Sequence, residues 1–363
     1  MKHDAARRQA HARGASLDGI NADPKWRRCF ARPTSLVTLF ALVAIAPMAA
    51  ATSQGVRDQT VDPGYLAGLH WRNIGPFRSG NVSSVTGIPD DPTTYYIGTP
   101  EAGVWKTSDA GTVWKPVFDE MHVASVGAIS VSPSNPNIVY AGTGDPSGWS
   151  FSQGNGVYKT TDAGATWRNV GLEKTHYINA LIVDPGNPDI VLVGAAGAAQ
   201  AGGAPSEDRG VYRSTDGGTT WKKVLYIDQY TGVKDMTFDA SDPHIVYAAF
   251  QRAAFGTSPA ELAKLAPLGT GIYRSVDEGA TWTPVGGQGL PAHIPSYELA
   301  VASGTGGQRI YAEAQGSGRD AGGVYRSDDG GHTWSLGTKE IGSAGGGVYT
   351  DPKNPKVVYL MGT

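Results

Sequence analysis

One motif, Ser/Thr-x-Asp-x-Gly-x-Thr-Trp, constrains this chain more than any other feature, because it comes round five times. Each copy follows a short Gly-hydrophobic-aromatic-Lys/Arg segment, which is typical of a β-strand. With these strands, the copies cover residues 103–114, 156–167, 210–221, 271–282 and 323–334. Their tryptophans lie 53, 54, 61 and 52 residues apart. Strand patterning with a period of about 50 residues predicts an all-β fold, a β-propeller with one four-stranded blade per repeat.

Each residue type in the motif has a structural role that explains its recurrence. The aspartate accepts backbone N–H groups within its own turn, the glycine supplies a positive φ, and the tryptophan packs between neighbouring sheets. We therefore expect ten structural residues: Asp109, Trp114, Asp162, Trp167, Asp216, Trp221, Asp277, Trp282, Asp329 and Trp334. A metal-binding or catalytic role for the aspartates is disfavoured, because a site needs side chains that converge at one place. The first copy departs from the pattern with Val113 where the others have threonine.

A second marker, an Asp-Pro or Asn-Pro turn between two strand-like segments, fixes the order of strands within a repeat. Each blade is predicted to run from inner strand A through this turn to strand B, then through a variable loop to strand C, the Asp turn and outer strand D. Residues 345–363 supply only strands A and B of a sixth blade. We therefore expect five full blades plus part of a sixth, in a truncated piece of a longer protein. The alternative is a six-bladed ring with one incomplete blade, which residues 70–75 (HWRNIG), similar to the start of a strand D, would help to close.

The first 51 residues are predicted to lie outside the fold. Residues 1–34 are basic and irregular, and residues 35–50 form an apolar run that is short for a membrane span. The run ends in an Ala-x-Ala cleavage pattern, so a signal peptide is expected to be removed after Ala51. The alternative is an uncleaved membrane anchor. Arg27 and Arg28 resemble part of a twin-arginine export signal, and ordinary secretion is the favoured alternative. The predicted layout is a leader over 1–51, a linker over 52–67 and the propeller over 68–363 of an exported, periplasmic or extracellular protein.

The charge and cysteine content of the exported part exclude several classes of function. The leader holds eight Lys/Arg and three Asp, so its removal leaves 22 basic and 30 acidic residues, a net charge of −8. An acidic chain is a poor partner for nucleic acid or for anionic membranes. The single cysteine, Cys29, leaves with the leader, which removes disulfide and thiol chemistry. No metal-binding, phosphate-binding or nucleophile-elbow motif is found, so neither metal nor cofactor is expected.

The repeats resemble those of the Asp-box (BNR-repeat) β-propellers of the sortilin N-terminal domain type. That group includes exported bacterial proteins described as glycosyl hydrolases. The stretches that carry the resemblance are 71–80 (WRNIGPFRSG), 103–118 and 142–167, and the likeness extends over residues 68–363. The resemblance implies the propeller fold. It leaves the activity open, because sialidases, xyloglucanases, sortilin-type receptors and photosystem II assembly factors all share the repeat.

The catalytic residues of these families map poorly onto this chain. In xyloglucanases a catalytic aspartate follows a threonine that resembles Thr99, but here Pro100 follows, and Glu101 comes one place later. Their second catalytic aspartate lies in a second propeller. Sialidases need three arginines, and only Arg78 has neighbours that resemble those of their first one. Arg213, Arg274 and Arg326 instead occupy the repeated strand C position.

A binding site is expected on the face formed by the B–C and D–A loops, which vary between repeats. Weak catalytic candidates are Glu101 and Asp145, a pair from adjacent blades. Ligand-binding candidates on this face are Arg78, Asp119, Glu120, Trp149, Phe151, His176, Asp228 and Asp235. Trp149 and Phe151 beside Asp145 could stack on a sugar ring, but we favour rim aromatics that pack on the next blade and, for Glu101 and Asp145, solvated surface carboxylates. A capping pattern also predicts a short helix over 259–265 in one B–C loop.

Two functions from different classes follow. The favoured one is an exported binding or scaffold module that recognises a protein, a peptide or a glycan through its D–A and B–C loops. The alternative is a glycoside hydrolase, xyloglucanase-like or sialidase-like, which requires two carboxylates facing each other about 5 to 10 Å apart.

Overall fold

The computed structural model describes residues 82–145, 152–197, 205–252, 259–291, 296–315, 322–339 and 345–362. All of them lie in the compact unit Asn73–Thr363. The predicted leader, the linker and the candidate residues Arg78, Trp149 and Phe151 lie outside the described residues.

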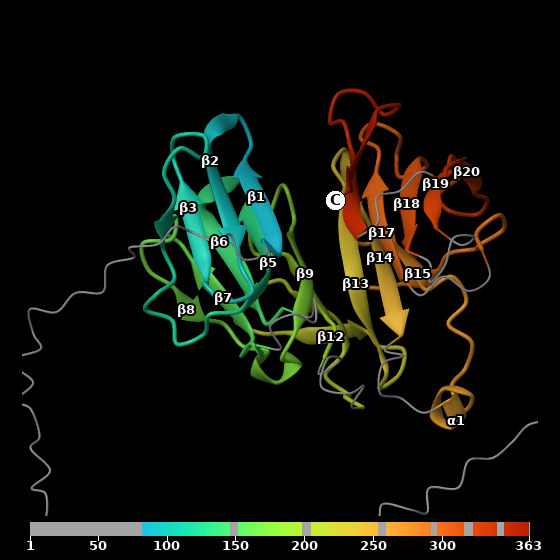
Figure 1. Ribbon diagram of the computed structural model, residues 1–363, viewed down its shortest axis with the longest axis horizontal. Coiled ribbons are helices and arrows are strands. Elements are labelled where there is room, and N and C mark those ends of the chain that lie inside the picture. The colour runs from blue at the N-terminus through green and yellow to red at the C-terminus, as the bar shows by residue number, and fades with distance from the viewer. Residues whose placement is uncertain are drawn as a thin grey trace, which may run out of the picture. The chain divides into compact units, whose positions relative to one another are not determined.

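The described strands form five four-stranded antiparallel sheets and one two-stranded sheet (Figure 1). Blade 1 holds β1 (Ser84–Ile88), β2 (Asp91–Gly98), β3 (Val104–Thr107) and β4 (Lys115–Pro116). Blade 2 holds β5 (Val126–Ser132), β6 (Asn135–Thr143), β7 (Val157–Thr160) and β8 (Arg168–Asn169). Blade 3 holds β9 (Ile178–Val183), β10 (Val191–Ala195), β11 (Gly210–Ser214) and β12 (Lys222–Leu225).

The second half of the chain repeats this layout. Blade 4 holds β13 (Thr231–Asp239), β14 (Asp242–Arg252), β15 (Ile272–Ser275) and β16 (Thr283–Pro284). Blade 5 holds β17 (Ser296–Val301), β18 (Ile310–Gln315), β19 (Gly323–Ser327) and β20 (Ser335–Thr338). Blade 6 holds β21 (Gly345–Thr350) and β22 (Val358–Gly362). Every sheet keeps its strands in chain order, so the predicted A–B–C–D arrangement is confirmed, and the inner strands of successive blades pack beside one another.

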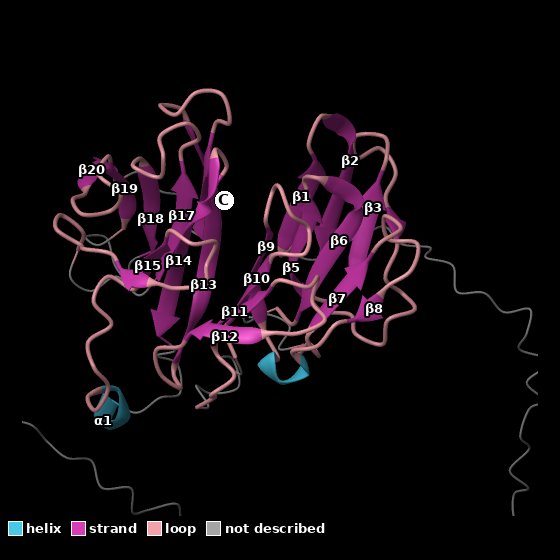
Figure 2. Cartoon of the chain, turned by 180° about the vertical axis from the view of Figure 1, so that it is seen from behind, coloured by secondary structure: helices cyan, strands magenta, loops and turns pink. Residues whose placement is uncertain are grey.

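Strands dominate the described chain, and helices are short (Figure 2). The helix predicted over 259–265 is present but shorter, as α1 (Pro259–Leu262). Beyond it, the Ala266 carbonyl accepts a hydrogen bond from Arg252 at 3.0 Å. Among the described residues, a 3₁₀ turn, η2, spans Glu173–Thr175. Neither of these two described helices has the length or the apolar character needed to cross a membrane.

The Asp turns have the geometry that the motif predicts. In blade 2, Asp162 Oδ1 accepts from the Thr160 hydroxyl at 2.6 Å and from the Thr166 amide at 2.8 Å. Its Oδ2 accepts from the Thr166 hydroxyl at 2.6 Å. These bonds lower the pKa of Asp162 to about 2, and the bond from the Thr160 hydroxyl has the largest effect. In blade 1, Val113 offers Asp109 its amide alone, at 2.9 Å, so one hydroxyl bond is lost.

The residue after each motif aspartate adopts a left-handed backbone, which the sequence did not reveal. Its φ lies between 56° and 73° in all five turns, at Ala110, Ala163, Gly217, Glu278 and Gly330. Three of the five residues are not glycine, and for these a positive φ is an unfavourable backbone conformation. At Ala163, Gly217 and Glu278 the carbonyl group of this residue accepts a hydrogen bond from the preceding blade.

The tryptophans connect neighbouring blades. The Trp167 indole donates to the Val117 carbonyl of blade 1 at 2.8 Å, and the Trp221 indole donates to the Val170 carbonyl of blade 2 at 2.7 Å. The Trp334 indole reaches the Gly286 carbonyl of blade 4 at 3.3 Å and also donates to Gly331 in its own turn at 2.9 Å. Trp282 differs, because its indole donates to Gly279 in its own turn at 3.0 Å. The predicted packing between sheets is seen at Trp167, Trp221 and Trp334, each with a hydrogen bond across the boundary.

The repeated Lys/Arg of strand C has a structural function that the sequence analysis missed. Lys106 donates to the Ala163 carbonyl of the next blade at 3.0 Å, and Lys159 donates to the Gly217 carbonyl at 3.1 Å. Arg213 donates to the Glu278 carbonyl at 2.9 Å. We call this contact, from the strand C cation to the left-handed residue of the next Asp turn, the inter-blade bond. It accounts for Arg213 as a structural residue of the repeat.

The hydrophobic core consists of layers between successive sheets. Tyr96 and Val104 of blade 1 pack with Val139 and Tyr158 of blade 2 in one such layer, and similar clusters follow between the later blades. Phe118 completes this layer and is only 2% exposed. Burying each large side chain contributes about 1.5–3 kcal/mol, so the layers hold the blades together and the loops are free to vary.

Candidate functional site

The loop-side candidates of blade 1 lie at the surface. Glu101 follows β2 in a turn that Thr99 closes, since the Ala102 amide donates to the Thr99 hydroxyl at 2.9 Å. Asp119 and Glu120 are likewise exposed in the segment after β4. Glu101, the first catalytic candidate, therefore has the position of a solvated surface carboxylate, as was expected for it.

Asp145 is not a solvated carboxylate, and here the prediction of a solvated pair was wrong. It is only 3% exposed and comes directly after β6. Its amide donates to the Ser125 hydroxyl at 2.9 Å, and the Gly144 amide donates to the Ser125 carbonyl at 2.9 Å. Gly144, with a φ of 84°, turns the chain back beside His176, where a Cβ would overlap the carbonyl oxygen. Close packing of the loop between blades 2 and 3 thus buries Asp145.

Asp228 belongs to a closed ion pair. Its Oδ2 lies 2.6 Å from Nη2 of Arg252, and its Oδ1 accepts from the Tyr230 amide at 2.8 Å. Thr231 donates its hydroxyl to the same carboxylate at 2.9 Å. Burial acts to raise the pKa of Asp228, but the bonds from Tyr230, Arg252 and Thr231 lower it overall. This arrangement ties the start of β13 to the end of β14 and gives Asp228 a structural role.

His176 shapes the loop before β9. It has a φ of 58°, and its carbonyl accepts from the Gly154 amide at 2.8 Å. Its backbone therefore joins the loop of blade 2 to the start of blade 3.

Asp235 stands out among the predicted candidates because its environment is desolvated. It lies in β13, where Oδ1 accepts from the Met236 amide and Oδ2 from the Leu299 amide of β17, both at 2.8 Å. Burial raises the pKa of Asp235 to about 6, against the opposing effect of these two bonds. A carboxyl group that is part-protonated near neutral pH marks a candidate functional position.

Two further carboxylates lie beside Asp235. Glu298 of β17 and Glu313 of β18 are direct cross-strand partners, an arrangement that like charges normally destabilise. Lys234 of β13 offsets part of this charge through an ion pair with Glu298 at 3.0 Å. Glu313 is 3% exposed, and its Oε2 is buried without a hydrogen-bond partner among the described atoms. Burial first, and then the charge of Glu298, raises the pKa of Glu313.

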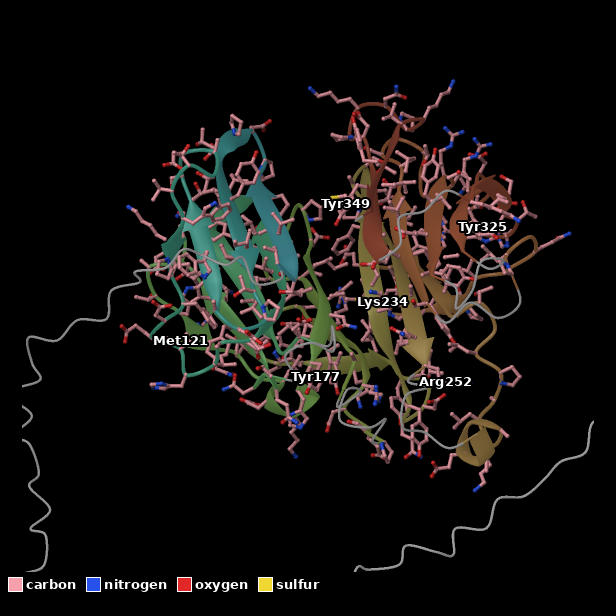
Figure 3. The ribbon with its side chains drawn as sticks, in the orientation of Figure 1. Met121, Tyr177, Lys234, Arg252, Tyr325 and Tyr349 are labelled. Carbon is pink, nitrogen blue, oxygen red and sulfur yellow. The ribbon has the colours of Figure 1, made fainter. Side chains whose placement is uncertain are left out.

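Tyr349 of β21 completes this group, and Figure 3 shows it together with Lys234. Its side chain is 49% exposed. Burial of the hydroxyl end, followed by the charges of the carboxylates, raises the pKa of Tyr349. We call Lys234, Asp235, Glu298, Glu313 and Tyr349 the carboxylate cluster. It offers an exposed aromatic ring next to Glu298, whose side chain is 20% exposed, whereas Glu313 is enclosed.

One departure from the repeat pattern in the sequence points to this cluster. Near the end of strand B, one aligned position holds Gly98 in blade 1, Gly142 in blade 2 and Gly194 in blade 3, whereas blade 5 has Glu313 there. In the described residues, no group of three or more His, Cys, Asp or Glu side chains is arranged to hold a metal ion.

Two family models match the chain. The model described as "Sortilin, neurotensin receptor 3" matches residues 102–254, and the model of the BNR/Asp-box repeat matches residues 325–336. The second match falls on the Asp turn of blade 5.

Curated relatives include two xyloglucanases. One, from Paenibacillus sp, is 26% identical over 264 residues, which cover 65% of this chain and 24% of the relative. The other, Xgh74A from Acetivibrio thermocellus, is 30% identical over 155 residues, which cover 38% of this chain and 17% of the relative. The chain thus matches less than a quarter of the length of these relatives.

Solved structures show the same fold. An ancestral GH74 enzyme has a TM-score of 0.58 at 21% identity, over 79% of this chain and 35% of that one. The GH74 enzyme of Niastella koreensis has a TM-score of 0.55 at 22% identity, over 77% of this chain and 43% of that one.

The repeats, the sheets and these matches together define the chain as an Asp-box β-propeller. It is of the type shared by sortilin and by glycosyl hydrolases such as the GH74 xyloglucanases.

Proposed function

We propose that this chain is an exported propeller module that recognises a glycan of the β-glucan class, such as xyloglucan. The observation that carries the proposal is the carboxylate cluster, in which half-exposed Tyr349 lies beside Glu298 and Glu313. Sugar rings stack on aromatic faces, and their hydroxyl groups donate to carboxylates that keep some exposure, as Glu298 does with 20% of its side chain. The similarity to two xyloglucanases supports a glucan as the ligand.

Recognition is favoured over hydrolysis because the cluster carboxylates are already engaged or enclosed. Asp235 accepts two backbone amides, and Glu298 pairs with Lys234. Glu313 is almost fully buried. Of the two carboxylates selected from the sequence, Asp145 is also buried, so it too is a poor proton donor to a polysaccharide.

The test is a binding titration with xyloglucan, with mixed-linkage β-glucan and with a glucose-free polysaccharide as the comparison. The protein is expected to bind xyloglucan, and Tyr349→Ala is expected to weaken binding about tenfold or more through loss of the stacking surface. Tyr226→Ala is the matched control, because Tyr226 is also exposed, at 40%, but lies after β12 in blade 3. Equal affinity of the two variants, or equal affinity for all three polysaccharides, would contradict the proposal.

Glycoside hydrolysis is the second candidate, and one specific observation favours it. Asp235 has its pKa raised to about 6, as a general acid of a glycoside hydrolase requires, and Glu313 has its pKa raised as well. Under this hypothesis Asp235→Asn abolishes the release of reducing sugars. Glu101→Gln and Asp145→Asn test the carboxylates selected from the sequence in the same assay. Sugar release that all three variants retain excludes each of these carboxylates as the catalytic one.

Export is also part of the proposal. The basic leader and the apolar run over residues 35–50 support cleavage after Ala51. Mass spectrometry of the protein recovered from the periplasm or medium is expected to give a chain that begins at Thr52. A protein that is recovered only with residues 1–51 attached would contradict this.

A further inference from the structure

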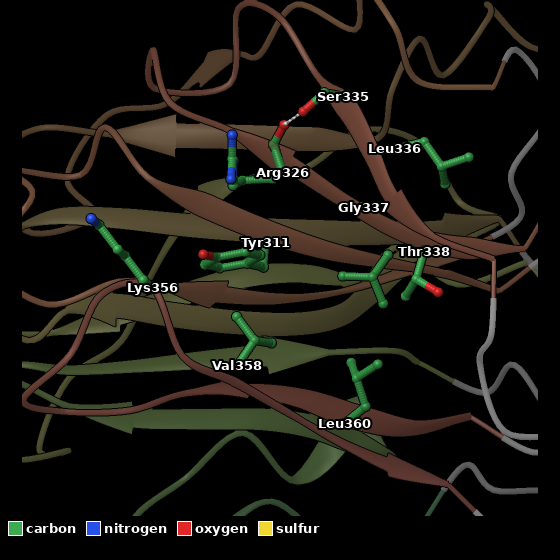
Figure 4. A pocket seen from close by; sticks show the side chains of 10 residues that line it. Tyr311, Arg326, Ser335, Leu336, Gly337, Thr338, Lys356, Val358 and Leu360 are labelled. Atoms are coloured by element: carbon green, nitrogen blue, oxygen red, sulfur yellow. Dashed lines mark hydrogen bonds between the residues drawn. The ribbon is translucent and has the colours of Figure 1, made fainter.

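Glu313 of the carboxylate cluster points into an apolar layer. It lies in β18 directly opposite Val324 of β19, so both side chains leave the same face of the blade 5 sheet. Val324 belongs to a buried cluster with Tyr311 and Val348, and Val358 packs against it. Figure 4 shows Tyr311 and Val358 in this layer. The Glu313 side chain is only 3% exposed, so its ionisation places a charge against apolar groups.

One oxygen of Glu313 lacks a donor. Oε2 is buried, and no hydrogen-bond partner for it occurs within the part of the chain that the structure describes. A buried, ionised carboxylate needs donors that replace the lost water. A protonated carboxyl group carries an O–H donor of its own and needs an acceptor instead. The lack of a donor at Oε2 therefore favours the protonated form of Glu313, provided that an acceptor lies close by.

The cross-strand partner of Glu313 in β17 is a second carboxylate, Glu298, and side chains at such positions have Cβ atoms about 4.5–5.5 Å apart. Oε1 of Glu298 lies 3.0 Å from Nζ of Lys234, an ion pair that favours the ionised form of Glu298. The Glu298 side chain is also 20% exposed, so it keeps some contact with water. Of the two glutamates, Glu298 is thus the one better suited to carry the negative charge.

Strand β21 leaves room for the Glu298 carboxylate. A Cβ at Gly347 would lie 3.0 Å from Oε2 of Glu298, which is closer than ordinary van der Waals contact. The Tyr349 hydroxyl lies 3.2 Å from the same position. The glycine therefore lets the carboxylate of Glu298 and the hydroxyl of Tyr349 border one point of the β21 backbone.

The other charged and titratable groups near this pair come from the strands on either side. They are Lys234 and Asp235 of β13 and Tyr349 of β21. Burial first, and then the negative charge of Glu298, raises the pKa of Glu313. A hydrogen bond from the Gly347 amide and the charge of Lys234 act in the opposite direction, with less effect. The balance of these interactions favours the neutral form of Glu313.

We propose that Glu313 is a positioning residue, which keeps a proton on Oε2 and donates it in a hydrogen bond to the carboxylate of Glu298. Together with the ion pair to Lys234, this bond holds the Glu298 carboxylate as an acceptor for a sugar hydroxyl beside Tyr349. When the pH rises, the proton leaves Glu313 for solvent, the two negative charges repel each other, and glycan affinity falls. The effect on affinity rests on the proposed function, whereas the position of the proton does not.

The first test follows the proton itself and uses no glycan. Carbon-detected NMR of the isotope-labelled protein reports the ionisation of each glutamate carboxyl group, and Glu313→Gln assigns the resonance of Glu313. That resonance is expected to titrate above the ordinary glutamate value of 4.5. Glu298→Gln is expected to move its midpoint downward, because the neighbouring charge is gone. Glu173→Gln is the matched control, since Glu173 is exposed in η2, and it should leave the midpoint unchanged.

The second test follows xyloglucan binding across the pH range in which this resonance titrates. The affinity of the unaltered protein is expected to fall about tenfold or more as Glu313 ionises. Glu313→Gln keeps an N–H donor to Glu298 at every pH, so it should bind as tightly as the protonated protein and lose the pH dependence. Glu313→Met has no donor and is expected to bind weakly at every pH. Asp235→Asn should retain the fall, which separates the proton of Glu313 from that of Asp235.

Three results would overturn the proposal. They are a Glu313 resonance that titrates together with the exposed glutamates, a midpoint that Glu298→Gln leaves unchanged, and equal pH profiles of binding for the unaltered protein and Glu313→Gln. Circular dichroism checks that each variant remains folded. A protein that binds no xyloglucan at any pH contradicts the proposed function, and the NMR titration still decides where the proton lies.

Discussion

Replacing Lys159 by methionine tests whether the inter-blade bond stabilises the propeller. Lys159 is 6% exposed, and its Nζ donates to the Gly217 carbonyl of the next blade at 3.1 Å. The ammonium group also lies 5.1 Å from the centroid of the Tyr140 ring. Burial lowers the pKa of Lys159, which shows that its desolvation opposes these gains. Methionine keeps most of the apolar stem but removes the donor, so the buried Gly217 carbonyl loses this hydrogen bond.

The expected loss follows from these contacts. A hydrogen bond from a charged donor contributes about 1.5–3 kcal/mol and a cation–π contact about 0.5–1 kcal/mol. Desolvation of the ammonium group offsets part of this sum, which leaves a net destabilisation of about 2 kcal/mol. For a domain of this size the melting temperature is then expected to fall by about 3 °C.

Lys106→Met is the matched comparison, because its acceptor has a second donor. The Ala163 carbonyl accepts from Lys106 at 3.0 Å and also from the Tyr96 hydroxyl at 2.9 Å. The acceptor therefore stays satisfied, and we expect a loss of less than about 1 kcal/mol. Differential scanning fluorimetry and urea unfolding compare the two variants under identical conditions. Equal melting temperatures, or a larger effect of Lys106→Met, would refute the reasoning.

Three further predictions follow from single positions. The pKa of Asp109 is already lowered, first of all by the hydrogen bond from the Val113 amide. Val113→Thr supplies the missing hydroxyl and is expected to lower this pKa further, which NMR titration measures. The variant is then expected to gain stability above pH 4 and to lose that gain as the pH falls toward 2. Asp235, with a folded pKa of about 6 against 3.8, is expected to make stability fall as the pH rises from about 4 to 6, and Asp235→Asn should remove that slope in urea unfolding. Gly127→Ala places a Cβ 2.3 Å from two backbone oxygens and is expected to cost about 3 kcal/mol or more in urea unfolding, whereas Gly186→Ala, with only a side-chain oxygen at 3.5 Å, should be close to neutral.

The strand order and the Asp turns could be predicted from the sequence, because they depend on local chemistry. Bonds such as that from the Thr160 hydroxyl to Asp162 join residues two apart, so the motif specifies them by itself. Trp167 could also be placed between sheets, since a large ring that recurs once per blade needs a covered position.

The contacts between blades could not be predicted in the same way. The partner of Lys159 is Gly217, which lies 58 residues along the chain, in the Asp turn of the next blade. The burial of Asp145 likewise depends on how tightly blades 2 and 3 approach, which composition does not report. The cluster around Asp235 was only partly found, because Glu298 and Glu313 reach it from strands of another blade.

Calorimetric titration of the protein with xyloglucan, combined with a reducing-sugar assay on the same samples, tests the central claim most directly. We expect saturable binding without sugar release, and about tenfold weaker binding or worse for Tyr349→Ala. A folded protein that does not bind xyloglucan, or one that releases sugar from it, would contradict the assignment as a glycan-recognising propeller.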